Sequence, residues 1–181
     1  MISQPKEGLL VRLRIAEKED AQFALNLRQD ANNTKYMPTI QITLEQQEKW
    51  IASQQAAKDS YFFIVERKNG ERIGTFSLYN IEGKKAESGR MIIRGTPIET
   101  TETVLLFHDF AFFDAGMDMV YSGIEKDNKP AVGVARSVAA VKEGEIEENN
   151  HVLDKYVLYK DTYNMSREAL VKIVKRFAKR V

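Results

Sequence analysis

The sequence predicts a mixed α+β fold in which a mostly antiparallel sheet is covered by helices on both faces. Three observations predict it. Residues 61–67 (YFFIVER) and 72–80 (RIGTFSLYN) are rich in aromatic and β-branched residues, and Asn69-Gly70 between them is typical of a two-residue hairpin turn. Residues 86–94 (AESGRMIIR) form a third strand after the Glu82-Gly83 turn. An apolar helix then leads to a strand over residues 119–124, which a right-handed crossover places parallel to the third.

The elements before the hairpin follow from local patterns. Residues 9–15 (LLVRLRI) alternate apolar and basic side chains, as an edge strand does, and residues 17–29 predict an acidic-led helix. Residues 30–42 are expected to form a loop. Thr43 and Gln46 have the spacing of a capping box, which predicts a helix from there to about Ala57 that carries Trp50 and Ile51.

The elements after the third strand are also predicted. The apolar helix runs from about Thr101 to Ala115, stops at Gly116 and is expected to be mostly buried. Pro130 to Val138 predicts a short helix. The last strands are expected within residues 142–149 and 151–160.

Composition places the chain among compact proteins of one domain, residues 1–181. It has 181 residues, of which 43% are apolar and 29% charged. There are no cysteines, which excludes disulfides, thiolate metal sites and a cysteine nucleophile. No segment reaches the roughly 20 apolar residues of a membrane span and none has the pattern of a leader, so we expect no membrane partner and a cytoplasmic location.

The order of elements over residues 9 to about 163 resembles the GCN5-related N-acetyltransferases, whose sheet contains a splayed parallel pair. Short strings narrow the resemblance to the branch with the RimJ/RimL-type enzymes and the amino-sugar-nucleotide acetyltransferases. These strings are RIAEKED (14–20), QQEKWI (46–51), YFFI (61–64), RIGT (72–75) and YVLYKDTY (156–163).

The resemblance implies acetyl-coenzyme A (acetyl-CoA) as acyl donor and a primary amine as acceptor. It implies that the main chain of Met91, Ile92 and Ile93 holds the pantetheine arm and polarises the thioester, while the start of the next helix receives the pyrophosphate. The residues that the resemblance implies for donor binding at this helix start are Ile98, Thr100, Thr101 and Thr103. Asn128 matches the asparagine that contacts the donor in this family.

The sequence departs from the family pattern in two places. The loop before the apolar helix lacks the usual glycines, and Glu99 and Glu102 put negative charge beside a pyrophosphate unless their side chains turn away. The tyrosine that many members use to protonate the departing thiolate would fall near Ala135. A proton donor must then come from elsewhere, for example Tyr121, Tyr156, Tyr159 or water.

Glu87 is the candidate general base, because an acceptor ammonium must lose a proton before it attacks. We expect it to share a strand face with Met91 and Ile93 and so to look into the cleft. The alternative is an ordinary solvent-exposed strand carboxylate. Tyr79 and Asn80, at the end of the preceding strand, line the acceptor site or are ordinary sheet-end residues.

No metal site is expected, because His108 lies on the buried helix and His151 begins a late strand. Residues 166–181 predict an amphipathic helix with one apolar stripe. Its six basic residues lie mostly off that stripe. The helix is expected to pack on the domain or on a second copy of the chain. The alternative is a surface for nucleotide phosphates, RNA or acidic protein. The stripe consists of Leu170, Ile173, Val174, Phe177 and Val181.

Three functions are compatible with the sequence. The first is N-acetylation of a small amine, such as a nucleotide-linked amino sugar, or of a protein amino terminus. The second is a regulatory or interaction module with a degenerate phosphate loop. The third, RNA association through the basic terminal helix, is the least favoured.

Overall fold

The computed structural model describes residues 5–38, 40–148 and 151–179. Within them one sheet of eight strands runs in the order β1-β2-β3-β4-β5-β6-β8-β7. The strands are β1 (Lys6–Glu7), β2 (Val11–Ile15), β3 (Tyr61–Arg67), β4 (Arg72–Glu82), β5 (Lys85–Ile93), β6 (Met119–Ile124), β7 (Val141–Glu148) and β8 (His151–Tyr159). The α-helices are α1 (Ala21–Gln29), α2 (Leu44–Ala56), α3 (Pro97–Asp109), α4 (Lys129–Ser137) and α5 (Lys160–Ala178). A 3₁₀ turn, Lys18–Asp20, precedes α1, and a π-helical turn, Phe110–Asp114, continues α3.

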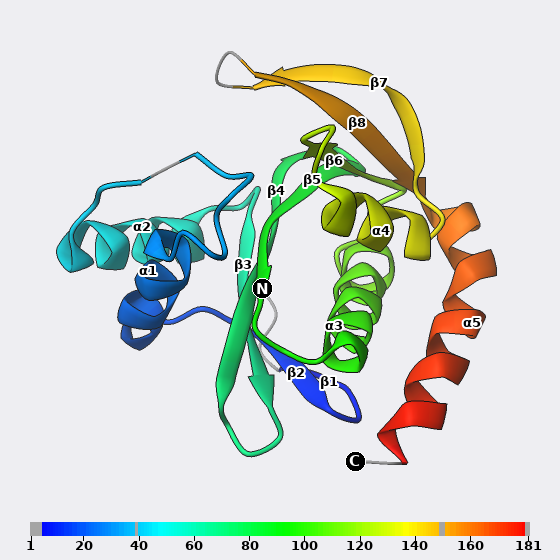
Figure 1. Cartoon of the computed structure of the whole chain (residues 1–181), viewed down its shortest axis with the longest axis horizontal. Coiled ribbons are helices and arrows are strands. Elements are labelled where there is room, and N and C mark those ends of the chain that lie inside the picture. The colour runs from blue at the N-terminus through cyan, green and yellow to red at the C-terminus, as the bar shows by residue number, and fades with distance from the viewer. Residues whose placement is uncertain (1–4, 39, 149–150, 180–181) are drawn as a thin grey trace.

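The predicted sheet topology is confirmed. Every neighbouring pair is antiparallel except β5 and β6, which run parallel and are joined through α3. Figure 1 shows α1 and α2 on one side of the sheet and α3, α4 and α5 on the other. The hairpin of β7 and β8 arches over the end of the sheet where β5 and β6 meet.

Apolar clusters on both faces of the sheet hold these layers together. The largest one joins α3 and α5 to the sheet, and its centre is the stacked pair Phe76 and Phe107, with ring centroids 3.6 Å apart. A smaller one lies under α1 and α2 and includes Ile51, Phe62 and Ile64. Because each fully buried side chain of this size stabilises the fold by about 1.5–3 kcal/mol, the sheet is fixed from both faces.

The capping box at the start of α2 is present as predicted. The Gln46 amide nitrogen donates to Thr43 Oγ1 at 3.2 Å, and the Thr43 amide donates to Gln46 Oε1 at 2.8 Å. The hairpin turn between β3 and β4 is different from the expected two-residue type. Gly70 has a φ of 86°, but Asn69 has no positive φ, so the turn is not one of the mirror-image type that needs two such residues.

The N-terminal strand is not the edge of the sheet. The expectation for residues 9–15 is corrected by β1, which pairs outside β2 with Lys6 opposite Leu13. The apolar helix also begins earlier than Thr101. Its N-cap is Thr96 and its first residue is Pro97, so residues 97–103, expected in part as a loop, are helical. Gly116, with a φ of 74°, follows the end of the π-helical turn, as predicted.

The terminal helix is longer than predicted, and its apolar stripe is only partly buried. It starts at Lys160, directly after β8, and buries Tyr163, Leu170 and Val174. Ile173 and Phe177 are 44% and 42% exposed, which corrects the expected stripe, and Val181 lies outside the described residues. The reason is that α5 packs mainly against α3, so only a narrow line of side chains is covered.

Polar contacts fix α5 on α3. Asp109 accepts hydrogen bonds from Arg167 at 2.6 and 2.7 Å and from the Tyr163 hydroxyl at 2.8 Å. Among the described helices, none is long and apolar enough to cross a membrane.

Candidate active site

Glu87 lies where the parallel pair of strands separates. The β5–β6 ladder runs from Lys85 opposite Met119 to Glu87 opposite Tyr121 and continues no further. The Glu87 residue is only 7% exposed, so the expectation of an ordinary solvent-exposed carboxylate is wrong. A buried carboxylate must be satisfied by hydrogen bonds.

Two residues of β4 donate to this carboxylate. The Tyr79 hydroxyl donates to Glu87 Oε1 at 2.8 Å, and Asn80 Nδ2 donates to Oε2 at 2.9 Å. Tyr79 is directly opposite Glu87 in the ladder. Asn80 is the extra residue of a β-bulge and has a φ of 51°, a conformation that asparagine tolerates, and the bulge aims its amide at Glu87. The structure therefore brings together the three predicted residues of the acceptor side.

The side chains that donate hydrogen bonds to Glu87 are neutral. Within the described ranges Glu87 forms no ion pair with lysine or arginine. Burial raises the pKa of Tyr79, and the negative charge of Glu87 raises it further. The pKa of Tyr121 is raised by the same two causes in the same order. Both phenols stay protonated at neutral pH and can act as hydrogen-bond or proton donors.

Gly89 makes room for this arrangement. A Cβ at position 89 would lie 2.7 Å from the Tyr79 hydroxyl oxygen, which is closer than real side chains approach. Any side chain there would push the Tyr79 ring off the strand and away from Glu87. Gly89 is not among the residues that the sequence predicts for the site.

A bulge at Arg90 changes the face on which the next residues lie. Ser77 pairs with Gly89 and Thr75 with Ile92, so β5 contains one extra residue, and Arg90 has a φ of 53°. Met91 and Ile93 consequently pack toward the α3 core, opposite Glu87. The expected common face of Glu87, Met91 and Ile93 is corrected, because a bulge shifts the two-residue alternation by one.

The two strands part at a pair of serines. The hydroxyl oxygens of Ser88 on β5 and Ser122 on β6 are 2.7 Å apart, and Ser88 also donates to the Tyr121 carbonyl at 3.4 Å. Beyond them, Met91, Ile92 and Ile93 have no ladder partner on β6. Peptide groups on that side of β5 are free to bind another amide-containing chain.

A family model described as an acetyltransferase (GNAT) domain matches residues 11–140. The chain belongs to this family. A search of curated proteins finds no significant match.

Solved structures give the same fold. The nucleotide-linked sugar GNAT FdhC is 20% identical with a TM-score of 0.82, and the alignment covers 96% of this chain and 99% of FdhC. Spermidine N-acetyltransferase from Vibrio cholerae, in complex with CoA and spermine, is 18% identical with a TM-score of 0.74 and covers 85% and 98%. A GCN5-related N-acetyltransferase from Brucella melitensis is 18% identical with a TM-score of 0.78 and covers 95% and 86%.

In this GNAT domain the start of α3 is closed by its own side chains. The Thr96 amide donates to Glu99 Oε2 at 2.7 Å, and the Glu99 amide donates to Thr96 Oγ1 at 3.3 Å. Arg67 donates to both oxygens of Glu99, at 2.7 and 3.2 Å. These hydrogen bonds lower the pKa of Glu99 to about 2. Ile98 takes no part in the box.

Glu102 is turned into the protein. Its carboxylate is 2% exposed and accepts the backbone amides of Leu9, Leu10 and Val11 at 2.6, 2.6 and 2.8 Å. Gly8 is required here, because a Cβ at that position would lie 2.6 Å from the carboxylate carbon. Glu102 therefore turns away from the start of α3, whereas the Glu99 carboxylate stays at the helix start and its charge is paired with Arg67.

The predicted threonines bond to their own helix. The hydroxyls of Thr100, Thr101 and Thr103 donate to the carbonyls of Thr96, Pro97 and Glu99, respectively. Thr103 is fully buried, so it cannot reach a ligand at the helix start. Ile98, Thr100 and Thr101 are half-buried there.

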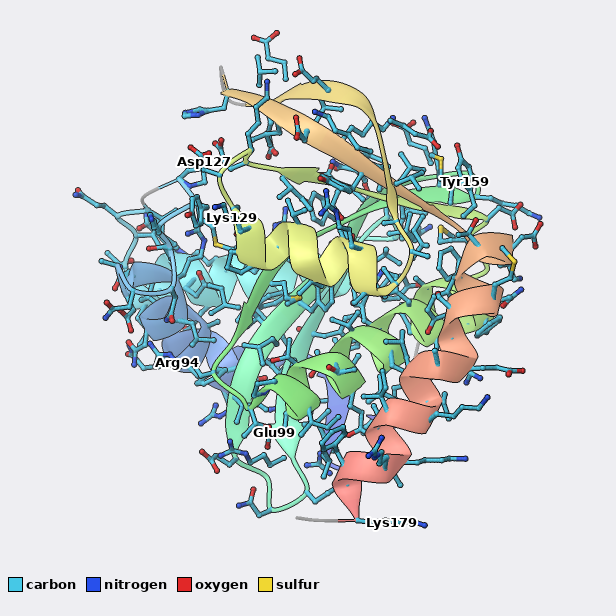
Figure 2. All side chains as sticks on the ribbon, turned by 45° about the vertical axis from the view of Figure 1, so that its right-hand side comes forward. Arg94, Glu99, Asp127, Lys129, Tyr159 and Lys179 are labelled. Atoms are coloured by element: carbon cyan, nitrogen blue, oxygen red, sulfur yellow. The ribbon has the colours of Figure 1, made fainter. Side chains whose placement is uncertain are left out.

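The start of α4 lies on the same side of the molecule as the start of α3. Asn128 caps α4, with Oδ1 accepting from the Ala131 amide at 3.2 Å. Figure 2 shows Lys129 at the first turn of α4 and Arg94 below it, at the end of β5. Arg94 pairs with Asp30.

The histidines do not contribute to this site. His108 is 5% exposed, its Nδ1 bonds to the Val104 carbonyl at 2.8 Å, and burial lowers its pKa to about 4. His151 is exposed and lies 3.4 Å from Glu125. In the described part of the chain no cluster of ligands could hold a metal ion.

One cavity of about 290 Å³ lies apart from Glu87. It is a partly open cavity lined by the C-terminal half of α2 and by β2 and β3, and none of Tyr79, Asn80 or Glu87 lines it. Its wall includes Gln54, Gln55, Ser60 and Phe62.

Proposed function

We propose that this GNAT domain transfers the acetyl group of acetyl-CoA to the primary amine of a nucleotide-linked amino sugar. The observation that carries the proposal is the buried Glu87 carboxylate at the separation of β5 and β6, bonded by the neutral donors Tyr79 and Asn80. Neutral donors orient the carboxylate and leave it free to accept a proton.

The donor side is proposed along β5. The unpaired peptide groups of Met91, Ile92 and Ile93 would bond the pantetheine amides and polarise the thioester carbonyl. The pyrophosphate would meet the starts of α3 and α4, with Ile98, Thr100, Thr101 and Asn128 around it and with Arg94 and Lys129 supplying positive charge. The closed capping box leaves fewer amides for phosphate than an uncapped helix offers, so these cations matter more.

Each residue at the separation of β5 and β6 has one role in the reaction. Glu87 accepts a proton from the acceptor ammonium, directly or through water. The nitrogen lone pair then forms a bond to the acetyl carbon, the nitrogen loses its second proton to solvent, and the carbon–sulfur bond breaks. Tyr121 donates its proton to the departing thiolate and recovers one from solvent. The direct attack needs no covalent enzyme intermediate, so neither a burst nor ping-pong kinetics is expected.

Tyr121 is preferred over the other two tyrosines on position. It stands opposite Glu87 at the end of the ladder. Tyr156 is buried beside Ile124 and Ala135. Tyr159 is exposed and donates to Glu143 at 3.1 Å.

The substrate class rests on the comparison with nucleotide-linked sugar enzymes. The alignment with FdhC includes almost the whole of both chains, whereas that with the spermidine enzyme leaves out more of this chain. The alternative acceptor is a protein amino terminus, as in the RimJ/RimL-like branch.

The test is an acetyl-transfer assay with several nucleotide-linked amino sugars, spermidine and a peptide with a free amino terminus. We expect products heavier by one acetyl group from an amino-sugar nucleotide and little or none from the others. Acetyl-CoA should also raise the melting temperature by mass action, by an amount that grows with its concentration. The absence of any shift at millimolar acetyl-CoA would leave the regulatory or interaction module as the better explanation.

A further inference from the structure

Arg90 occupies an unusual position beside the proposed acceptor site. Its guanidinium carbon lies 4.1 Å from the centre of the Tyr79 ring and 5.3 Å from that of Trp50. Its Nη1 donates to Gln54 Oε1 at 3.3 Å. Among the described residues no carboxylate lies within ion-pair distance of it. The charge is held between two aromatic rings without a negative partner.

Arg28, in the last turn of α1, is a second cation without a carboxylate. Its Nη2 donates to the Pro38 carbonyl at 2.8 Å, whereas its Nη1 is buried and has no hydrogen-bond partner. Burial lowers the pKa of Arg28, and the charge of Arg90 lowers it further. A buried donor without a partner, next to a second positive charge, is costly for a folded protein. An anion between them would remove both costs.

The other arginines show that this pair is an exception. Six arginines of the described part form ion pairs: Arg12, Arg14, Arg67, Arg72, Arg94 and Arg167. Arg136 and Arg176 have none, but both side chains are exposed to water. Arg28 and Arg90 are thus the partly buried arginines that form no ion pair with another described residue.

The position of the pair relative to Glu87 suggests its ligand. Arg90 lies over the face of the Tyr79 ring, and the Tyr79 hydroxyl donates to Glu87. One aromatic ring therefore separates the guanidinium from the carboxylate. In a nucleotide-linked amino sugar, one sugar ring separates the amine from the first phosphate. In the protein and in the substrate, one six-membered ring thus lies between the positively charged group and the negatively charged group.

We propose that Arg28 and Arg90 bind the diphosphate of the acceptor, so that its amino group reaches Glu87. This inference rests on the proposed function and names the part of the substrate that is recognised. Planar guanidinium groups suit phosphate oxygens because they donate two parallel hydrogen bonds. The same charges repel a polyamine.

Glu148 borders this space from the end of β7. Desolvation raises the pKa of Glu148 most. The negative charge of Glu87 raises it further, and the positive charge of Arg90 lowers it. The β7–β8 hairpin thus brings a carboxylate within electrostatic range of both Glu87 and Arg90.

The experiment measures binding of UDP and dTDP by isothermal titration calorimetry, with the intact protein and with saturating CoA to occupy the donor side. We use Arg90→Asn, because asparagine tolerates the positive φ at this bulge, and Arg28→Gln. Each should weaken binding by about 10- to 100-fold, since a hydrogen-bonded charge is lost. Arg136→Gln is the matched control and should bind as the wild type does.

Two further variants protect the test against misfolding. Arg90→Lys and Arg28→Lys keep the charge but lose the two parallel hydrogen-bond donors of the guanidinium group. They should have the melting temperature of the wild type and bind UDP and dTDP with intermediate affinity. For all variants the affinity for acetyl-CoA should stay unchanged. Equal nucleotide binding by wild type, Arg90→Asn and Arg28→Gln would overturn the inference, as would no binding of UDP or dTDP by the wild type.

The outcomes also separate the inference from the proposed function. If the wild type acetylates amines but binds neither nucleotide, acetyl transfer stands and the diphosphate site is wrong. If nucleotide binding depends on both arginines but no acetyl transfer occurs with any amine, the anion site stands and the proposed function is wrong.

Discussion

Glu87 on β5 and the pair Glu99 and Glu102 on α3 are all buried carboxylates, but their surroundings differ. Glu102 accepts three backbone amides, and Glu99 is bonded to Arg67 and to the Thr96 amide. Glu87 accepts from a phenol and a side-chain amide, both neutral. Hydrogen bonds from backbone amides and from cations lower the basicity of a carboxylate, whereas neutral side-chain donors mainly orient it. The difference teaches that burial alone does not mark a catalytic carboxylate.

The largest effect is expected at Glu87. Glu87→Gln should lower turnover by about 10² to 10⁴, because a proton acceptor is lost and little volume changes. The melting temperature and the affinity for acetyl-CoA should change little. Steady-state kinetics and a thermal melt check this, and a variant as fast as wild type would remove Glu87 from the mechanism.

Glu102→Gln should show the opposite behaviour. An amide offers a single acceptor oxygen and sets its own N–H groups against backbone donors, so we expect a loss of about 2–4 kcal/mol in the free energy of unfolding. For a chain of this size that is about 2–4 °C in melting temperature per kcal/mol. Turnover of the folded variant should stay within a few-fold. Unchanged stability together with tighter CoA binding would mean that Glu102 faces the phosphates after all.

Gly89→Ala tests the orienting role of Tyr79. The new methyl group should displace the Tyr79 ring and lower turnover by about tenfold, with KM for acetyl-CoA unchanged. Tyr79→Phe should have a similar effect. If the methyl acts through Tyr79, the double variant should be no slower than either single one. Additive losses would show that the two positions act separately.

Glu99 gives the smallest effect and a dependence on pH. The pKa of Glu99 is about 2 in the folded protein and 4.5 when the residue has no partners. Its contribution to the free energy of unfolding is therefore full above pH about 4.5 and is lost as the pH falls toward 2. Denaturant unfolding between pH 7 and pH 3 should therefore be steeper in pH for wild type than for Glu99→Gln. At neutral pH the variant should lose about 1 kcal/mol. Parallel curves would contradict the assignment.

Much of the fold could be predicted because its signals are local. The capping box of Thr43 and Gln46, the β3–β4 hairpin and the parallel β5–β6 pair are all present. The early start of α3 also had a local signal, since Thr96-Pro97-Ile98-Glu99 combines a capping box with a proline at the first helical position. The family resemblance predicts a loop at these residues, and the local capping signal outweighs it.

The candidate site could be predicted only in part. Glu87, Tyr79 and Asn80 come together because the hairpin register pairs Tyr79 with Glu87. The bulge at Arg90 could not be foreseen, since arginine has no preference for a positive φ and the bulge is fixed by its contacts with α2. The packing of α1 against β4, with Arg28 close enough to Arg90 for their charges to interact, is likewise a product of tertiary packing, and no sequence pattern signals it.

The most direct test of the account is the pH dependence of kcat/KM for the amine acceptor, measured for wild type and Glu87→Gln over the range in which the amine is mostly protonated. If Glu87 takes the proton from the bound ammonium, the wild-type rate should be nearly level there. The variant should depend on free amine and accelerate about tenfold per pH unit. Two profiles of the same shape would contradict the central claim that Glu87 is the base.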